Sequence, residues 1–226
     1  MLAAALAALA APADAAERRF TVTGFERIQV EGPFEVTLAT GRASSAVATG
    51  STQAIDRVSI EVQGRTLRIR PNRSAWGGYP GEGTGPLKIS VSTHELRSAS
   101  VSGSGSIAID KAKGLRFDLS VAGSGRLGIG AVDADNLFVA LVGSGKISLA
   151  GKTKELIASV QGAGDLDAAA LTADEAKINA DTAGAISVAV RRAAEVTATG
   201  PGDTKIIGRP SCKVKSLGSG RVACGG

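Results

Sequence analysis

A Gly-x-Gly turn recurs along the second half of this chain at almost constant spacing. Six such turns and one degenerate copy are separated by 20, 20, 19, 20, 18 and 18 residues. Their first residues are Gly103, Gly123, Gly143, Gly162, Thr182, Gly200 and Gly218. A short motif repeated this evenly indicates one structural unit stacked on copies of itself. The second half of the chain is therefore predicted to be a repeat architecture.

The residues on both sides of each turn alternate with a period of two. After a turn, the second and fourth residues are mostly branched and apolar, as in Ile107 and Ile109. The same alternation leads into the next turn, as in Phe117, Leu119 and Val121. A period of two with β-branched residues on one face predicts strands rather than helices. Each repeat should therefore hold two short strands.

Two strands, a glycine corner and a return loop make one circuit of about 18–20 residues. The sequence thus predicts an all-β fold, a single-stranded parallel β-solenoid (β-helix) whose coils stack about 4.8 Å apart. Glycine suits the corners because a sharp turn often needs a positive φ. If the turns were hairpins, the strands would pair antiparallel within one repeat, as in a meander or a propeller, and this alternative stays open.

The chain before Gly103 is less regular but keeps the strand pattern. Strand-like segments lie at Arg27–Val30, Phe34–Leu38, Val58–Val62, Leu67–Arg70 and Leu87–Val91. We expect one β-solenoid domain over residues 16–226. Within it, residues 20–100 should form an N-terminal cap and the opening coils, and residues 101–226 the regular Gly-x-Gly coils. The Gly/Pro-rich stretch Gly77–Pro86 is short enough to be a loop within that domain.

The first 15 residues are predicted to be a signal peptide. An Ala/Leu run at Leu2–Ala11 is followed by Pro12 and a series of small residues. This order resembles the apolar region and cleavage site of a secretory signal, with the cut after Ala15. The run is too short to span a bilayer, and no other segment reaches about 18 apolar residues. We therefore expect an exported protein, in the periplasm or at the cell surface.

Cys212 and Cys224 are the only cysteines, and both take inward positions in the last coil. An even pair in an exported chain usually forms a disulfide, which here would close the C-terminal coil. Two buried free thiols are the alternative. A metal site needs more ligands, and the one histidine, His94, is far away in the sequence. We therefore expect no metal and no cofactor.

The formal net charge of +5 favours anionic neighbours such as lipid headgroups, acidic glycans or nucleic acid. No basic run exceeds two residues, however, and aromatic residues make up only 3% of the chain. A nucleic-acid groove with stacking platforms is therefore not indicated. A glycan or an envelope protein is the expected kind of partner.

Two motifs in the N-terminal half add a family resemblance. The sequence reads Phe25-x-x-Ile28-x-Val30-x-Gly32-x-Phe34-x-Val36 and then Gly64-x-x-Leu67-x-Ile69. Together with the later Gly-Ser-Gly coils, these motifs resemble the bacterial head GIN domain family, described as putative auto-transporter adhesins. The resemblance covers roughly Phe20 to Val222. It implies a β-solenoid in an exported envelope protein.

β-Solenoid enzymes that cut acidic polysaccharides carry carboxylates on one outward face, and this chain offers such residues. Asp165 and Asp167 follow the Gly162 turn at outward positions about 7 Å apart along a strand. Asp203 takes the first of these positions two coils later, but Ala185 interrupts the series. The separation suits an inverting glycosidase pair, whereas charged outward residues are also ordinary on a solvated surface.

The segment from Ser74 to Pro80 holds the only Trp and the only Tyr of the chain, Trp76 and Tyr79. Aromatic side chains on a Gly-rich loop can stack on a sugar or anchor a protein partner, because they bring a large contact area at modest entropic cost. The alternative is a hydrophobic lid folded over the first coils.

Phe138 and Ile157 break the alternation, because both fall at outward positions one coil apart. They should therefore be neighbours on one face, with Val142 outward on the same strand as Phe138. An exposed apolar patch of this kind often marks an interface. Cover by the N-terminal segment or by a loop is the alternative.

These features favour a non-catalytic, exported cell-envelope module of the binding or adhesion type, with Trp76, Tyr79, Phe138 and Ile157 as contact candidates. A polysaccharide-active enzyme, a lyase or a glycosidase, is the second hypothesis and would use Asp165, Asp167 and Asp203. A structural role through homotypic end-to-end contacts is the third.

Overall fold

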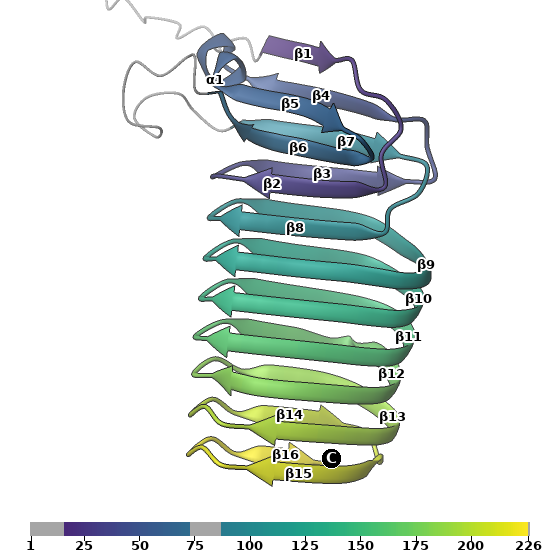
Figure 1. The fold of residues 1–226 in the computed structure, drawn as a ribbon, viewed down its shortest axis with the longest axis vertical. Helices are drawn as coiled ribbons and strands as arrows, with labels where there is room; N and C mark the ends of the chain where they lie inside the picture. The colour runs from purple at the N-terminus through teal and green to yellow at the C-terminus, as the bar shows by residue number, and fades with distance from the viewer. Residues whose placement is uncertain (1–15, 73–86, 226) are drawn as a thin grey trace, which may run out of the picture.

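The computed structural model describes residues 16–72 and 87–225. It confirms an all-β parallel β-solenoid, in which each coil lies beside the previous one and the stack forms a rod (Figure 1). All strands belong to one 16-stranded sheet, with the main order β1-β4-β7-β3-β9-β10-β11-β12-β13-β14-β16. The meander and propeller alternatives are wrong, because the regular coils pair parallel with their neighbours.

The strands fall into two groups. The strands before the first Gly-x-Gly turn or ending at it are β1 (Ala16–Phe20), β2 (Arg27–Glu31), β3 (Glu35–Thr40), β4 (Ser45–Gly50), β5 (Val58–Gln63), β6 (Thr66–Pro71), β7 (Lys88–Thr93) and β8 (Ser98–Gly103). The regular coils contain β9 (Ser106–Gly123), β10 (Arg126–Gly143), β11 (Lys146–Gly162), β12 (Asp165–Thr182), β13 (Ile186–Ala198), β14 (Thr204–Ile207), β15 (Ser211–Ser216) and β16 (Val222–Cys224).

Each regular coil contributes to two layers of the rod. The first part of a coil continues the line of β3 and the second part continues the line of β8. We call these the β3 layer and the β8 layer. The expectation of two short strands per coil needs correction, because β9 to β12 are continuous strands of 17 or 18 residues. Pairing with the next coil persists around the bend, with only local register shifts such as that between Ile129 and Val132.

The two glycines of a corner meet different requirements. In the corners that begin at Gly103, Gly123, Gly143 and Gly162, the first glycine has a positive φ, such as 101° at Gly103, as predicted for the sharp turn, whereas Gly200 and Gly218 do not. The second does not need one, but a Cβ on Gly125 would lie 2.7 Å from the carbonyl oxygen of Gly105 in the preceding coil. No side chain fits at that distance. The second glycine therefore permits the close stacking of coils.

The degenerate corner at Thr182 is closed by its side chain. The Thr182 hydroxyl donates to the carbonyl oxygen of Gly164 at 3.0 Å and accepts from the backbone N–H of Gly184 at 2.9 Å. This buried hydroxyl is therefore fully engaged, as a buried polar group requires. A threonine can thus stand at a position that glycine takes in the other coils.

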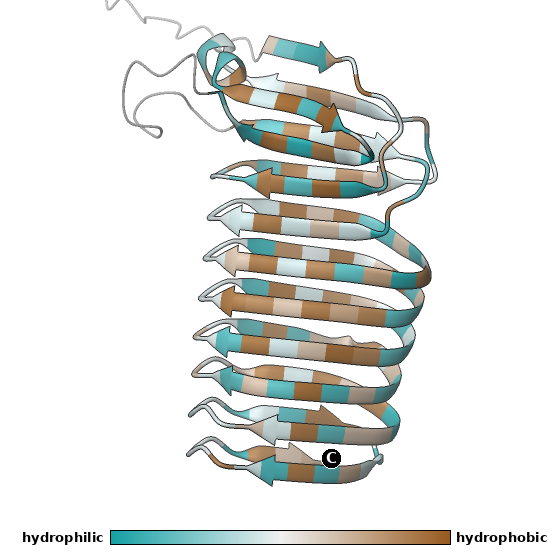
Figure 2. Cartoon of the chain, viewed as in Figure 1, coloured by the Kyte–Doolittle hydropathy of each residue, from teal (hydrophilic) through white to brown (hydrophobic). Residues whose placement is uncertain are grey.

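The core runs along the rod axis between the two layers. Alternating inward residues are buried, and Figure 2 shows the same alternation as apolar and polar bands along each strand. In β10, Leu137 and Leu141 are fully buried and Val139 is 3% exposed. Their register partners in β9 and β11 are also apolar and buried, so the inward residues form continuous ladders. Such burial is the main stabilising term of the fold.

The N-terminal cap departs from the regular winding. β1 and β4, β4 and β7, and β5 and β6 pair antiparallel. β7 lies outside β3 rather than between β3 and β9, although it follows β3 in the sequence. The one described helix, α1 (Thr52–Asp56), begins at Ser51, whose hydroxyl accepts from the N–H of Ala54. The strands of the cap are therefore not stacked in the order in which they follow one another in the chain.

Candidate functional site

The predicted apolar neighbours lie side by side in the β8 layer. Phe138 of β10 is the register partner of Ile157 of β11, and both side chains are half-buried. Val142, four residues after Phe138 on β10, is 52% exposed. We call Phe138, Val142 and Ile157 the Phe138 patch. An apolar group of this kind on an otherwise alternating strand is unusual, because the outward positions of the neighbouring coils are mostly polar.

An arginine lies over the ring of Phe138. The guanidinium carbon of Arg116 is 4.1 Å from the ring centroid, which is a cation–π contact. Asp118, the register partner of Phe138 in β9, forms an ion pair with Arg116 at 2.9 Å. The hydrogen bond from Arg116 to Asp118, and then the charge of Asp118, raise the pKa of Arg116. Arg116 therefore stays charged and covers one face of the aromatic ring.

A cavity of about 620 Å³ lies next to Arg116, where the β9 coil bends. Leu115 lines it and is 77% exposed, the most exposed of the large apolar residues described. Arg97 and Glu95 line the side toward the cap. The cavity thus lies between the Phe138 patch and the N-terminal end of the rod. Its lining combines an exposed apolar residue, Leu115, with charged neighbours.

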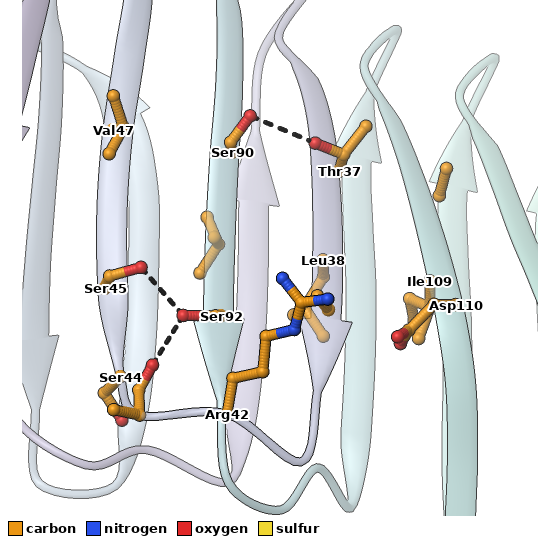
Figure 3. A pocket seen from close by; sticks show the side chains of 14 residues that line it. Thr37, Leu38, Arg42, Ser44, Ser45, Val47, Ser90, Ser92, Ile109 and Asp110 are labelled. Carbon is orange, nitrogen blue, oxygen red and sulfur yellow. Dashed lines mark hydrogen bonds between the residues drawn. The ribbon is translucent and has the colours of Figure 1, made fainter.

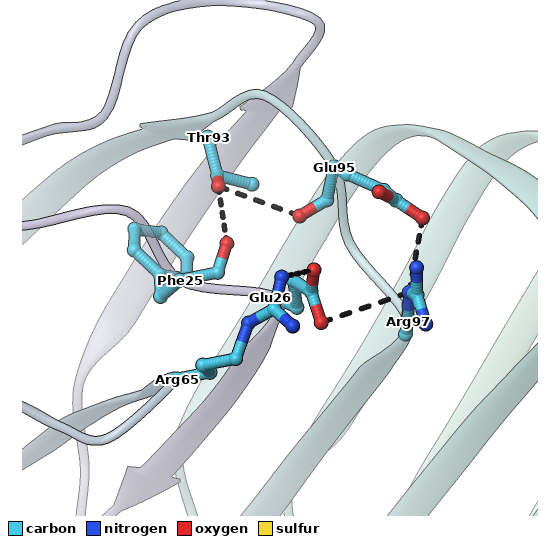
Figure 4. A network of polar contacts seen from close by, with 6 residues as sticks. All are labelled: Phe25, Glu26, Arg65, Thr93, Glu95 and Arg97. Atoms are coloured by element: carbon cyan, nitrogen blue, oxygen red, sulfur yellow. Dashed lines mark hydrogen bonds and ion pairs between the residues drawn. The ribbon is translucent and has the colours of Figure 1, made fainter.

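The wall of this cavity is held by a network of charges (Figure 4). Glu26, whose side chain is 14% exposed, forms ion pairs with Arg65 and with Arg97, the latter at 3.7 Å. Arg97 also pairs with Glu95 at 2.9 Å. The backbone carbonyl of Glu26 accepts from the N–H of Arg97 at 2.7 Å, so the network fastens the start of β2 to the loop before β8. No sequence pattern indicated this network, because its members are far apart in the chain.

The carboxylates considered for catalysis bind backbone groups. Asp165 accepts from the N–H of Ala185 at 2.8 Å, and Asp203 accepts from the N–H of Arg221 at 3.0 Å. Each acceptor lies one coil from its donor, so these two carboxylates cap the corner of the next coil. Asp167 is exposed and reaches only the N–H of Ala169, at 3.4 Å. This arrangement gives Asp165 and Asp203 a structural function in joining coils.

Two other predicted features have different outcomes. Trp76 and Tyr79 lie outside the described residues, as do the predicted signal peptide at 1–15 and the whole Gly/Pro-rich stretch Gly77–Pro86. Cys212 and Cys224 form a disulfide with a Cα–Cα distance of 6.6 Å. Their register partners, Ala194 and Ile206, are buried, so both cysteines take inward positions in the last coil. The disulfide ties β15 to β16.

Within residues 16–72 and 87–225, no cluster of His, Cys, Asp and Glu has the arrangement of a metal site. In the same part of the chain, no helix has the length and apolar character needed to cross a membrane.

The fold and the exposed patch define a class of protein, the capped parallel β-solenoids with an outward apolar patch on one layer. The chain belongs to the family described as "Putative auto-transporter adhesin, head GIN domain", whose model matches residues 24–210. This membership confirms the resemblance read from the sequence. No similarity to a curated protein is found.

Solved structures share the fold over nearly the whole chain. A putative adhesin from Bacteroides fragilis has a TM-score of 0.84 at 18% identity and covers 93% of this chain and 96% of its own. A putative lipid binding protein from Parabacteroides distasonis has a TM-score of 0.70 at 24% identity, covering 92% and 96%. A putative adhesin from Parabacteroides merdae has a TM-score of 0.71 at 18% identity, covering 93% and 95%. At these identities the likeness concerns the fold alone.

Proposed function

We propose that this protein is a non-catalytic binding module of the adhesion type, exported to the cell envelope, and that it holds a protein partner through the Phe138 patch. The observation that carries the proposal is the pairing of Phe138 and Ile157 on an outward face, with the charged Arg116 stacked on the ring. Aromatic and arginine side chains dominate the energetics of protein interfaces. The family description and the names of its structural neighbours support an adhesion role.

A protein partner suits the patch better than a sugar. A sugar ring stacks on an open aromatic face, whereas Arg116 already covers one face of Phe138. Ile157 and Val142 add aliphatic contact area that a protein surface can bury. The Cys212–Cys224 disulfide supports the exported location, because such bonds persist in oxidising compartments.

The test measures retention of the purified protein on envelope membranes of the bacterium that produces it, before and after protease treatment of those membranes. We expect retention that protease treatment abolishes. Phe138→Ser with Ile157→Ser should weaken retention at least about tenfold, since buried aromatic contacts at interfaces are worth about 2 kcal/mol or more. Thr197→Ala, a change three coils from Phe138 in the β8 layer, should leave it unchanged.

Two results would contradict the proposal. Retention that survives protease treatment would point to lipid or glycan instead, and phosphatidylglycerol vesicles belong in the assay because one structural neighbour is described as lipid-binding. Release of reducing ends from polygalacturonate, lost in Asp165→Ala, would establish the enzyme hypothesis. Loss of retention in the double variant supports the proposal only if the variant has the same thermal midpoint as the parent. We expect the same midpoint, because both substitutions are at outward positions.

A further inference from the structure

A second candidate site lies in the β3 layer, on the other side of the rod from the Phe138 patch. A cavity of about 800 Å³ extends over β4, β7, β3 and the first part of β9 (Figure 3). Outward hydroxyl groups line it from three neighbouring strands: Ser45 from β4, Ser90 and Ser92 from β7, and Thr37 from β3. The strand register therefore places these hydroxyl groups next to one another on the outer surface of the sheet.

The hydroxyls are held in fixed directions by one another. Ser92 donates to the carbonyl oxygen of Ala43 at 2.5 Å and lies 2.7 Å from the hydroxyl oxygen of Ser45. Since Ser92 uses its proton on Ala43, Ser45 donates to Ser92 and keeps its acceptor lone pairs free. Thr37 donates to Ser90 at 3.3 Å, which leaves the Ser90 proton free. A hydroxyl has one donor and two acceptor sites, so the cavity offers both a donor and an acceptor to a ligand.

Two charged residues line the cavity among the described residues, Asp110 and Arg42. Asp110 accepts from the N–H of Thr40 at 2.9 Å and from the N–H of Lys111 at 2.6 Å, so its carboxylate is held by the backbone. Arg42 has no ion pair among the described residues, and its guanidinium extends across the cavity in front of Leu38 (Figure 3). An exposed, unpaired arginine beside oriented hydroxyls is suited to a carboxylate.

The cavity continues along the rod. A second cavity of about 420 Å³ shares Ala108 and Ile109 with the first and extends over β10, β11 and β12. Together they cross seven consecutive strands of the sheet, β4 to β12, which is a length of about 30 Å at the usual strand spacing. We call this combined feature the β3-layer trough. Its length and its opening to solvent match an extended chain rather than a small molecule.

Two more cations border the trough. Arg126 and Lys146 are exposed and are register partners of each other. Each lies two residues before a residue that lines the trough, Gly128 and Ser148 respectively. Neither has an ion pair among the described residues, and Asp165, the next residue in this ladder, is turned to the N–H of Ala185. In the β8 layer, by contrast, several lysines are paired across coils, as Lys177 is with Glu155 at 3.3 Å. Arg42, Arg126 and Lys146 thus place unpaired positive charge along the trough, beside an exposed carboxylate of its lining, Asp167.

We propose that the β3-layer trough binds an extended anionic polysaccharide. Carboxylates of the sugar chain pair with Arg42, Arg126 and Lys146, and its hydroxyls bond to Ser45 and Ser90. An acyl chain is a poorer occupant, because it would leave much of its surface in water in an open trough. The lining residues of both cavities include no aromatic side chain on which nucleic-acid bases could stack.

The test uses the purified full-length exported protein with polygalacturonate as the anionic probe and amylose as the neutral one, measured by isothermal titration calorimetry. We expect binding to polygalacturonate that weakens with salt, and no binding to amylose. Arg42→Gln should weaken binding about tenfold or more, as expected for loss of a charged hydrogen bond. Arg42→Lys should retain part of the affinity. Arg42 has no described side-chain partner, so the variants should melt like the parent.

Lys215→Gln is the matched control, since it removes the same charge from exposed β15 in the other layer. If Lys215→Gln weakens binding as much as Arg42→Gln does, the attraction is a general effect of net charge and the proposal is wrong. Binding to phosphatidylglycerol vesicles that depends on Arg42, without binding to polygalacturonate, would also overturn it. The Phe138→Ser/Ile157→Ser variant should bind polygalacturonate as the parent does. The polysaccharide proposal and the protein-contact proposal are therefore tested by different variants, and either can fail without the other.

Discussion

At the scale of single residues, the paired glycines of each corner are the strongest determinants of this fold. The positive φ of the first glycine in the corners from Gly103 to Gly162 could be predicted from the sequence, because a sharp turn often uses it. The need for the second glycine could not, because it arises from the distance between coils. A Cβ on Gly145 would lie 2.6 Å from the carbonyl oxygen of Gly125, one coil away. Only the stacked structure reveals that contact.

We expect Gly125→Ala to lower the free energy of unfolding by about 1–3 kcal/mol, because its Cβ would press on the backbone of the preceding coil at 2.7 Å. Gly128→Ala is the matched control on the same coil, where the nearest atom to a Cβ is 4.0 Å away. It should change stability by less than about 0.5 kcal/mol. Urea denaturation followed by circular dichroism measures both. Equal midpoints for the two variants would show that the corner stacking is wrong.

The site residues show the same division between what a sequence reveals and what it does not. The neighbouring positions of Phe138 and Ile157 followed from the repeat alignment alone, because outward residues of adjacent coils must align in a parallel stack. The stacking of Arg116 on Phe138 did not, since it runs diagonally between coils. The hydrogen bonds from backbone N–H groups to Asp165 and Asp203 could not be predicted either. Ala185 stands between these two residues in the ladder, so the sequence shows no repeated carboxylate at that position.

At the scale of elements, the regular coils were predictable and the cap was not. β9 to β12 repeat one pattern, so each copy supports the interpretation of the others. β1 and β4 have no such support, because β1 is mostly charged and β4 is mostly small residues. Their antiparallel pairing depends on contacts between distant segments, and the placement of β7 outside β3 does as well. Local sequence patterns carry little information on such contacts.

The last coil is held by its disulfide. β15 is exposed along its whole length, and Val214 in it is 43% exposed although its register partner Val196 is fully buried. We expect the Cys212→Ser/Cys224→Ser variant to open locally, because an edge coil with half a core has little other stabilisation. Amide exchange after about Gly200 should rise, while the coils at Gly123 and Gly143 stay protected.

Hydrogen exchange with mass spectrometry measures this difference directly. The disulfide closes a loop with a sequence separation of 12 residues, for which the chain-entropy model gives about 3 kcal/mol. Uniform loss of protection along the whole rod would contradict the account of a locally held coil. Two free thiols in the exported protein would contradict the disulfide itself.

At the scale of the whole molecule, the solenoid separates two surfaces on one rigid rod. The Phe138 patch lies in the β8 layer and the trough with Arg42 lies in the β3 layer. Ladders of hydrogen-bonded strands join the two surfaces in one sheet. The two proposed sites therefore face opposite sides of the rod, so that both partners could be bound at the same time.

If the proposed contact is right, the Phe138 patch is buried when the protein is held on the envelope. Hydroxyl-radical footprinting of free and envelope-bound protein measures it, because oxidation reports the exposure of each side chain. We expect Phe138, Val142 and Ile157 to be oxidised several times less in the bound state, whereas Leu217, which is 66% exposed in the free protein, should be unchanged. Unchanged oxidation of the patch in the bound protein, or protection centred on Leu217 instead, would contradict the account.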